Sequence, residues 1–219
     1  SLRSNEIAIL ASPGMTNEEL FLIKRIFRDG LRIENLGFRV PPKGEPSSDD
    51  FLIQPDKNPN TRGADEVGLV PAAVPPTAEA ILMAAAEQRI KALYVFHHDL
   101  FESRLDPRLV EKALSSLELI VFQGSNANAT SRYAHFVLPS ATFAEKEGTF
   151  TNFQGRVQRI SRAIEPLGES LPDSRILLSL AEALGLYIPY TSPEEVFAGL
   201  SSSVQAFSGL DYRSIGSQG

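Results

Sequence analysis

The 219-residue sequence contains no cysteine and only three histidines, His97, His98 and His135. Iron–sulfur clusters are held chiefly by cysteine thiolates, and structural zinc sites usually need cysteine as well. The absence of cysteine therefore excludes iron–sulfur clusters and thiolate-bound metals from these residues. Three histidines are also few for an all-histidine metal site, so we expect no metal site in the chain.

Long apolar runs and an excess of basic charge are absent too. The longest apolar runs, such as Ala80–Ala86, fall far short of the ~20 residues that a membrane-spanning helix needs. The 21 basic residues face 27 acidic ones, a net charge of -6, without the clustered Lys and Arg of a nucleic-acid-binding surface. The start lacks the charged and apolar regions of a secretion signal, so we expect a cytoplasmic protein. Because the first residue is Ser1, we expect the chain to be part of a longer protein.

The first thirty residues have the pattern of a strand, a turn and a capped helix. The apolar run 6–11 ends in Ser12-Pro13-Gly14, which favours a turn. Thr16 and Glu19 have the spacing of a capping box, and the apolar stripe that follows predicts an amphipathic helix that Gly30 ends.

Further strands and helices alternate along residues 6–145. Short runs rich in β-preferring residues predict strands at 92–96, 119–122 and 136–138. Helical patterns occupy the segments 77–89, 107–116 and 128–134. Strands that alternate with helices imply parallel βαβ units with right-handed crossovers. The sequence therefore predicts an α/β fold with a doubly wound, mainly parallel, Rossmann-like sheet.

Three segments lie outside this regular pattern. Residues 41–76 hold eight of the fifteen prolines and are expected to form a long irregular excursion, which is usually functional or packed against something. Residues 146–200 are expected to form a C-terminal extension, with an extended segment at 155–161 and helices that start at Asp173 and Ser192. The Ser- and Gly-rich tail 201–219 is expected to be mobile.

The loops after the predicted strands carry the candidate site residues, because ligands of open α/β sheets bind outside the carboxyl ends of the strands. Ser12 precedes a helix whose free N–H groups could hold a phosphate, or the loop is a plain capped turn. His97 and His98 directly follow a strand, and one imidazole could act as a general base or metal ligand. The alternative is one packed or solvated histidine and one exposed. Gly124 and Ser125 follow the next strand, where the glycine would permit close approach of a ligand.

One stretch carries a specific resemblance. The residues 136–158 read FVLPSATFAEKEGTFTNFQGRVQ, and 165–185 read EPLGESLPDSRILLSLAEALG. These resemble the regions "VLP…ATFAEKEGTFTN-EGRVQ" and "P-x-G-E-A-x-P-D-W-x-I-L-x-x-L-A-x-A-L-G" of the molybdopterin oxidoreductases. The resemblance covers most of residues 6–187 and implies the domain type of formate dehydrogenase and dimethyl sulfoxide reductase. In such proteins, the strand-end loops hold the nucleotide halves of a bis-pterin guanine dinucleotide.

Within the family, residues 50–53 and 58–65 are most similar to the G subunit of NADH-quinone oxidoreductase, with formate dehydrogenase the nearest rival. Several loops depart from the family pattern. His97-His98-Asp99-Leu100 stands where the family has G-E-N-P, and Gly124 stands where it has an Asp. Thr130 alone survives from the T-E-T-A block. The acidic group that would pair with guanine is thus lost, which favours a scaffold over a pterin site.

Three functions follow from these observations. The first is a scaffold or assembly part of a respiratory NADH-quinone oxidoreductase, itself neither catalytic nor a cofactor carrier. Its partners would be other subunits and other domains of its own subunit, which would hold the iron–sulfur clusters, and it would be peripheral to the membrane through the complex. The second is the molybdopterin guanine dinucleotide-binding part of a formate-dehydrogenase-like oxidoreductase. In that protein the strand-end loops, with Ser12, His97, His98, Gly124, Ser125 and Thr130, would line the cofactor cleft. The third is a free-standing α/β module for a small ligand.

Overall fold

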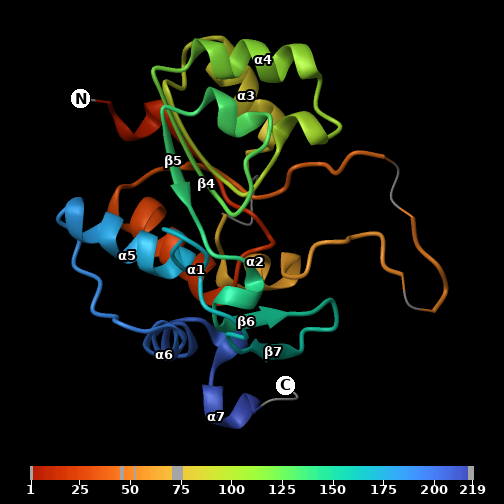
Figure 1. Cartoon of the computed structure of the whole chain (residues 1–219), viewed down its shortest axis with the longest axis vertical. Coiled ribbons are helices and arrows are strands. Elements are labelled where there is room, and N and C mark those ends of the chain that lie inside the picture. Colours follow the sequence, from red (N-terminus) through yellow and green to blue (C-terminus); the bar gives the residue numbers. More distant parts are fainter. Residues whose placement is uncertain (1, 45–46, 52, 71–75, 217–219) are drawn as a thin grey trace.

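A five-stranded parallel sheet forms the centre of the protein (Figure 1). In this computed structural model, the structure describes residues 2–44, 47–51, 53–70 and 76–216. The strand order is β2-β1-β3-β4-β5, and every neighbouring pair in this sheet is parallel. A separate antiparallel hairpin, β6-β7, follows the sheet in sequence. The predicted doubly wound α/β fold is confirmed.

The strands are short. Those that start at residues 7, 92, 119 and 136 match the predicted apolar runs closely, the one at 157–160 lies in the predicted extended segment, and the strands at 35–37 and 148–151 were not predicted. The strands are β1 (Ile7–Leu10), β2 (Asn35–Gly37), β3 (Ala92–Phe96), β4 (Leu119–Gly124), β5 (Phe136–Pro139), β6 (Gly148–Thr151) and β7 (Val157–Ile160). The α-helices are α1 (Asn17–Ile23), α2 (Thr61–Val67), α3 (Ala78–Ala86), α4 (Pro107–Ser116), α5 (Asp173–Ala183), α6 (Pro193–Ser203) and α7 (Tyr212–Ile215). The segment 128–134, expected to be helical, holds only the short 3-10 turn Thr130–Tyr133.

The two faces of the sheet have separate hydrophobic cores, because successive side chains of a strand point to opposite faces. On β3, Leu93 and Val95 pack with α3 and α4, whereas Tyr94 and Phe96 pack with α1, α5 and α6. Figure 1 shows the result as layers, with α3 and α4 above the sheet and the other labelled helices below it. No helix within the described ranges is long and apolar enough to cross a membrane.

Helix α1 differs from its prediction. The capping box of Thr16 and Glu19 is present, but all seven residues of α1 are buried, so the predicted amphipathic pattern holds only in the helical turns that follow α1. Its polar residues are covered by α5, α6 and β6, which come more than 130 residues later and which the local pattern could not reveal. The helix continues as a π-helix, Lys24–Gly30, and Leu31 follows it in a right-handed helical conformation. Gly30 is therefore a residue of the helix rather than the left-handed cap that we expected.

The Pro-rich excursion contains a helix that its composition did not predict. Helix α2 begins after Asn60, whose side chain donates to the Met15 carbonyl oxygen at 2.8 Å and accepts from the Thr151 N–H at 2.7 Å. A side chain at Gly63 would collide with Asn17 and Asn60, so this helix packs closely only because of the glycine. The excursion is thus held to α1 and β6 at this point. Residues 45, 46, 52 and 71–75 of it lie outside the described part.

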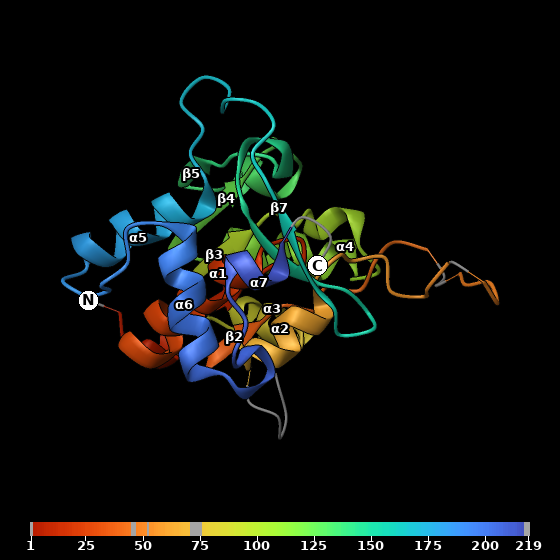
Figure 2. The same ribbon diagram turned by 90° about the horizontal axis from the view of Figure 1, so that it is seen from below.

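The C-terminal extension packs against α1 instead of forming a separate unit. Seen from below, α6 and α7 lie in front of α1 (Figure 2). We expected residues 201–219 to be mobile, yet Phe207, Tyr212 and Ile215 are buried in the core below the sheet. Three large side chains outweigh the Ser- and Gly-rich composition here, because burying such side chains stabilises a segment by about 1.5–3 kcal/mol each. Residues 217–219 lie outside the described part.

The packing of this segment can be tested at Phe207, which is 1% exposed. We expect Phe207→Ala to lower the free energy of unfolding by about 3–5 kcal/mol in urea titrations, because it removes a buried ring. Phe51, 92% exposed, provides the matched control, and Phe51→Ala should change stability by less than about 0.5 kcal/mol. Equal effects of the two substitutions would show that residues 204–216 do not pack as described.

Candidate functional site

The carboxyl ends of the parallel strands meet at one edge of the sheet, where the predicted site residues lie. The strand order reverses between β1 and β3, the position at which ligands of such sheets bind. Here His98 bridges the two strands, because its Nε2–H donates to the Ala11 carbonyl oxygen at 2.8 Å. Burial lowers the pKa of His98 to about 4, so the imidazole is neutral. His98 therefore closes the switch point, in the packed role that we gave as one alternative.

His97 points away from His98, toward the start of α5. Its backbone is in the left-handed region, with φ of 58°, which costs about 1–3 kcal/mol in a residue other than glycine. Its Nε2 lies 3.0 Å from Oδ1 of Asp173, a fully buried carboxylate. The strained backbone of His97 thus occurs together with a contact that joins the loop after β3 to the start of α5.

Asp173 belongs to a buried network of charged groups centred on Lys146. The Lys146 ammonium donates to Asp173 at 2.8 Å and to Glu19 at 2.9 Å, and all three residues are buried. Burial alone would lower the pKa of Lys146, but the two carboxylates raise it well above its usual range. Burial alone would raise the pKa of Asp173, but Lys146 and His97 have the opposite, larger effect, so the pKa of Asp173 lies well below its usual range. Lys146 and Asp173 are therefore an ionised pair inside the protein.

The network extends into the sheet through neutral hydrogen bonds. Gln123, in β4, donates from Nε2 to Asp173 at 2.7 Å and accepts from the Tyr94 hydroxyl at 2.6 Å. Both lone-pair directions of Asp173 Oδ1 are then used by Gln123 and His97. Residues from α1, β3, β4, α5 and the turn before β6 are thus fixed relative to one another.

A second buried carboxylate lies one residue before Glu19. Glu18 accepts from the Thr149 N–H at 2.9 Å and from the Tyr212 hydroxyl at 2.9 Å, and so connects α1 to the hairpin and to α7. Burial raises its pKa to about 7, and the hydrogen bonds from Thr149 and Tyr212 counteract only part of that shift. This group titrates near neutral pH inside the fold.

The remaining predicted residues lie along the same edge but mostly serve the fold. The Ser12 hydroxyl accepts from the Gly14 N–H at 3.1 Å, and the capping box already uses donors of α1 that an anion would need. Thr130 accepts from the Leu100 N–H at 2.7 Å and donates to Asp99 at 3.0 Å. A side chain at Gly124 would lie 2.8 Å from the Phe122 ring, which explains the glycine without a ligand.

Ser125 is the exception among these residues, because its side chain is exposed at the edge. Its one recorded contact is a hydrogen bond that the Asn126 amide donates at 3.2 Å. A contact of any of these six residues with a cofactor stays a prediction.

A cavity of about 570 Å³ opens beside the switch point, at the carboxyl ends of β1 and β2. It is lined by Pro13, Phe38–Pro42, Thr61, Leu105 and residues 55–58 and 77–79. Its charged residues are Arg39, Asp56, Lys57 and Glu79. The volume lies in the range of roughly 300–1,000 Å³ that is typical of small-molecule sites.

Reasoning from the sequence missed the charged residues of this cavity. Arg39 pairs with Asp65 at 2.7 Å, and Lys57 donates to the Ser47 and Gln54 carbonyl oxygens. Asp56 accepts from the Asn58 N–H at 2.9 Å through one oxygen. The one signal that could have found them was the length of the excursion, since long loops in compact domains are usually functional.

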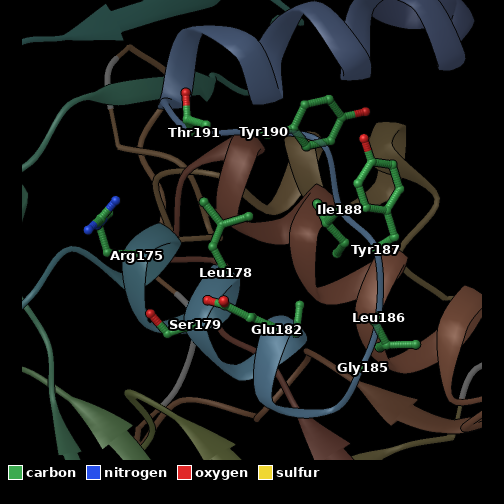
Figure 3. A pocket seen from close by; sticks show the side chains of 11 residues that line it. Arg175, Leu178, Ser179, Glu182, Gly185, Leu186, Tyr187, Ile188, Tyr190 and Thr191 are labelled. Carbon is green, nitrogen blue, oxygen red and sulfur yellow. The ribbon is translucent and has the colours of Figure 1, made fainter.

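A further groove of about 480 Å³ runs along α5 and the segment that follows it (Figure 3). Tyr187 and Tyr190 lie along one wall, and Arg175 lies at the opposite end, away from Glu182. The groove contains no residue from the strand-end loops. It is thus separate from the edge that the sequence singled out.

The comparison with protein families settles which group of proteins has this edge. Residues 20–183 match the family described as molybdopterin oxidoreductase. The chain belongs to the molybdopterin oxidoreductase family. The resemblance that the motifs at 136–158 and 165–185 indicated is confirmed at this level.

Relatives in the family are formate dehydrogenase alpha subunits. The F420-dependent formate dehydrogenase 2 subunit alpha of Methanococcus maripaludis is 37% identical over 145 residues, which are 65% of this chain and 21% of that one. The corresponding subunit of Methanocaldococcus jannaschii is 39% identical over 128 residues, 58% of this chain and 19% of that one. The chain thus spans about a fifth of the length of these relatives. These relatives support the resemblance to formate dehydrogenase. They do not support our expectation that the chain is most similar to the G subunit of NADH-quinone oxidoreductase.

A solved structure of this family type shares the fold. The acetylene hydratase of Pelobacter acetylenicus superimposes with a TM-score of 0.51 at 18% identity, over 61% of this chain and 19% of that one. A sequence identity this low supports a shared fold and does not support a shared function. The parallel sheet described above is thus the one found in molybdopterin oxidoreductase domains.

The buried network makes a prediction about Lys146. We expect Lys146→Met to lower the free energy of unfolding by about 3–5 kcal/mol, because Glu19 and Asp173 then stay buried without a cation. Lys112 is exposed on α4, and Lys112→Met should change stability by less than about 0.5 kcal/mol. A loss below about 1 kcal/mol for Lys146→Met would mean that the network does not hold these elements together.

A second prediction concerns His98 and pH. The folded protein keeps His98 neutral down to a pKa of about 4, whereas the unfolded chain takes up a proton near pH 6.5. Stability is therefore lost as pH falls from 7 to 5, by about 2 kcal/mol for this group. His98→Gln keeps a donor for Ala11 and removes the titration. Urea titrations at pH 7 and 5 should show a loss about 2 kcal/mol larger for the wild type, and equal losses would contradict the buried, neutral histidine.

Proposed function

We propose that the chain is the molybdopterin guanine dinucleotide-binding part of a formate-dehydrogenase-like oxidoreductase. The observation that carries the proposal is the cavity at the carboxyl ends of β1 and β2, in a chain whose relatives are formate dehydrogenase alpha subunits. In α/β sheets, nucleotides bind at this end of the strands. The cavity would take the guanosine end of the cofactor.

The residues of the cavity fit such a group. Pro41, Pro42 and Pro55 supply apolar surface of the kind that covers the faces of a base. The Thr61 hydroxyl is buried in the wall and lies beside the Asp56 carboxylate, where it helps to lower the pKa of that group.

The charged residues give each part of a guanine nucleotide a partner. Asp56 accepts hydrogen bonds from Asn58 through Oδ1 and lies beside the Thr61 hydroxyl. Its carboxylate would accept from N1–H and the 2-amino group of guanine in place of the Thr61 contact. Lys57 and Arg39 would face the phosphates as cations. This would supply the acidic group lost at Gly124 from another loop. When bound, the pterin would supply the metal centre at which oxidation takes place, while this chain orients the nucleotide.

The proposal is tested with guanosine diphosphate as the probe, adenosine diphosphate as the comparison and saturating inorganic phosphate in every sample. We expect a saturable rise in melting temperature with the guanine nucleotide and a smaller one with the adenine nucleotide, since a ligand of the native state stabilises it. Asp56→Asn should remove this preference, because the amide presents donors to guanine donors. Asp50, exposed and outside the cavity, gives the control Asp50→Asn, which should keep the preference.

Equal shifts with the two nucleotides in the wild type would refute the guanine site. So would a guanine preference that survives in Asp56→Asn. Either result would favour a second candidate, a scaffold in a respiratory NADH-quinone oxidoreductase. Its specific support is that Ser12, His97, His98 and Thr130 are bonded within the fold itself. In that case the chain would dock other subunits at the cytoplasmic side of the membrane, and neighbouring domains would carry the iron–sulfur clusters.

A further inference from the structure

A second charged cavity, of about 460 Å³, lies between the end of the hairpin and the starts of α5 and α6. Arg159, Arg162 and Arg175 line it, against a single acidic residue, Glu147. These arginines come from β7, from the segment after β7 and from α5, so the fold collects them from separate places. In a chain with a net charge of -6, three arginines around one cavity are a local exception.

The ion pairs of these arginines leave donors unused. Arg159 lies 3.4 Å from Glu147, a loose contact, and its guanidinium stacks over the Tyr212 ring at 4.4 Å. Its Nε–H is buried and has no hydrogen-bond acceptor among the described residues. Arg162 pairs with the exposed Glu165 at 3.1 Å. For Arg175, the described part of the chain records no ion pair, and Figure 3 shows its side chain projecting from the first turn of α5.

The start of α5 adds neutral donors to the same cavity. This eleven-residue helix begins after Pro172 without a side-chain cap, so no side chain uses its first N–H groups. Those of Arg175 and Ile176 donate to the Pro172 carbonyl oxygen, and those of Asp173 and Ser174 have no acceptor among the described residues. Ser174 is 5% exposed and lines the cavity, and its hydroxyl makes no hydrogen bond within the described residues. A hydroxyl without a partner on a largely buried residue, next to the N–H groups of Asp173 and Ser174 and to arginines, is the arrangement that an anion satisfies.

Ser174 also distinguishes this chain from the family pattern. The motif that 165–185 resembles has Trp directly after its Pro-Asp, and this chain has Ser174 there. A tryptophan at this position would occupy space that the smaller serine leaves open.

We propose that this cavity binds the dianionic phosphate group of a small phosphorylated molecule. Glu147 and Glu165 pair with Arg159 and Arg162, so Arg175 is the one arginine of the cavity for which the described residues record no ion pair, and the other two guanidinium groups keep unused N–H donors. Planar guanidinium groups donate pairs of parallel hydrogen bonds to phosphate oxygens, and the Ser174 hydroxyl and the α5 N–H groups complete the set of donors. The proposal is independent of the guanine site, because the two cavities share no residue.

The test uses the whole 219-residue chain and inorganic phosphate, with sodium chloride at matched ionic strength as the reference. We expect phosphate to raise the melting temperature saturably above the chloride reference. Arg175→Ala should weaken binding at least about tenfold, because it removes a charge-assisted pair of hydrogen bonds. Ser174→Trp should abolish binding by filling the cavity. Arg108, exposed on α4 and outside the cavity, gives the control Arg108→Ala, which should bind like the wild type.

Arg175 is exposed, so its replacement leaves the fold intact and keeps the test decisive if Ser174→Trp does not fold. A phosphate response equal to that of chloride would overturn the proposal. A saturable response that Arg175→Ala and Arg108→Ala share would also overturn it, because phosphate would then bind elsewhere. Neither result touches the guanine preference, which is measured in saturating phosphate.

Discussion

The ion network of Lys146 is the interaction on which the rest of the structure depends. The buried Lys146 ammonium contacts the carboxylates of Glu19 in α1 and Asp173 in α5. Asp173 is in turn hydrogen-bonded to His97 and Gln123. Charges in the interior are costly unless they are paired and hydrogen-bonded. Each of these charged groups is therefore stable in the interior only when the elements that carry its partners are also packed in place. The network specifies one arrangement of sheet, hairpin and C-terminal extension.

This constraint also decides where a ligand can enter. His98 joins the loops after β1 and β3, and Gln123 ties the carboxyl end of β4 to Asp173. The open space lies to either side of that rigid edge, in the cavity near Asp56 and in the arginine-lined cavity near Ser174. A site built on fixed elements loses little freedom when a ligand binds.

Much of the fold could be predicted from local patterns. The apolar runs, the Thr16 capping box and the Asp106-Pro107 helix start are properties of adjacent residues, and the structure has each of them. The burial of α1 could not be predicted, because Asn17 and Glu18 are satisfied by Thr149, 131 or more residues away. The buried Phe207 and Tyr212 were likewise hidden by a composition rich in Ser and Gly.

Of the candidate site, too, one part could be predicted from the sequence and another part could not. The position of Ser12, His97 and Gly124 at the carboxyl edge follows from the strand pattern alone, and it was predicted. Lys146 and Asp173 lie in motifs that were noticed for their resemblance, but the 2.8 Å contact between them depends on tertiary packing. Asp56 and Lys57 lie in an irregular segment that has no periodicity to place them.

The measurement that tests the central claim most directly is a crystal structure of the chain soaked with guanosine diphosphate. The account predicts density for the nucleotide at the carboxyl ends of β1 and β2, with guanine donors within hydrogen-bond distance of the Asp56 carboxylate. Lys146 should stay between Glu19 and Asp173. Nucleotide density that lies elsewhere, or a cavity near Asp56 that is closed by protein side chains, would contradict the account.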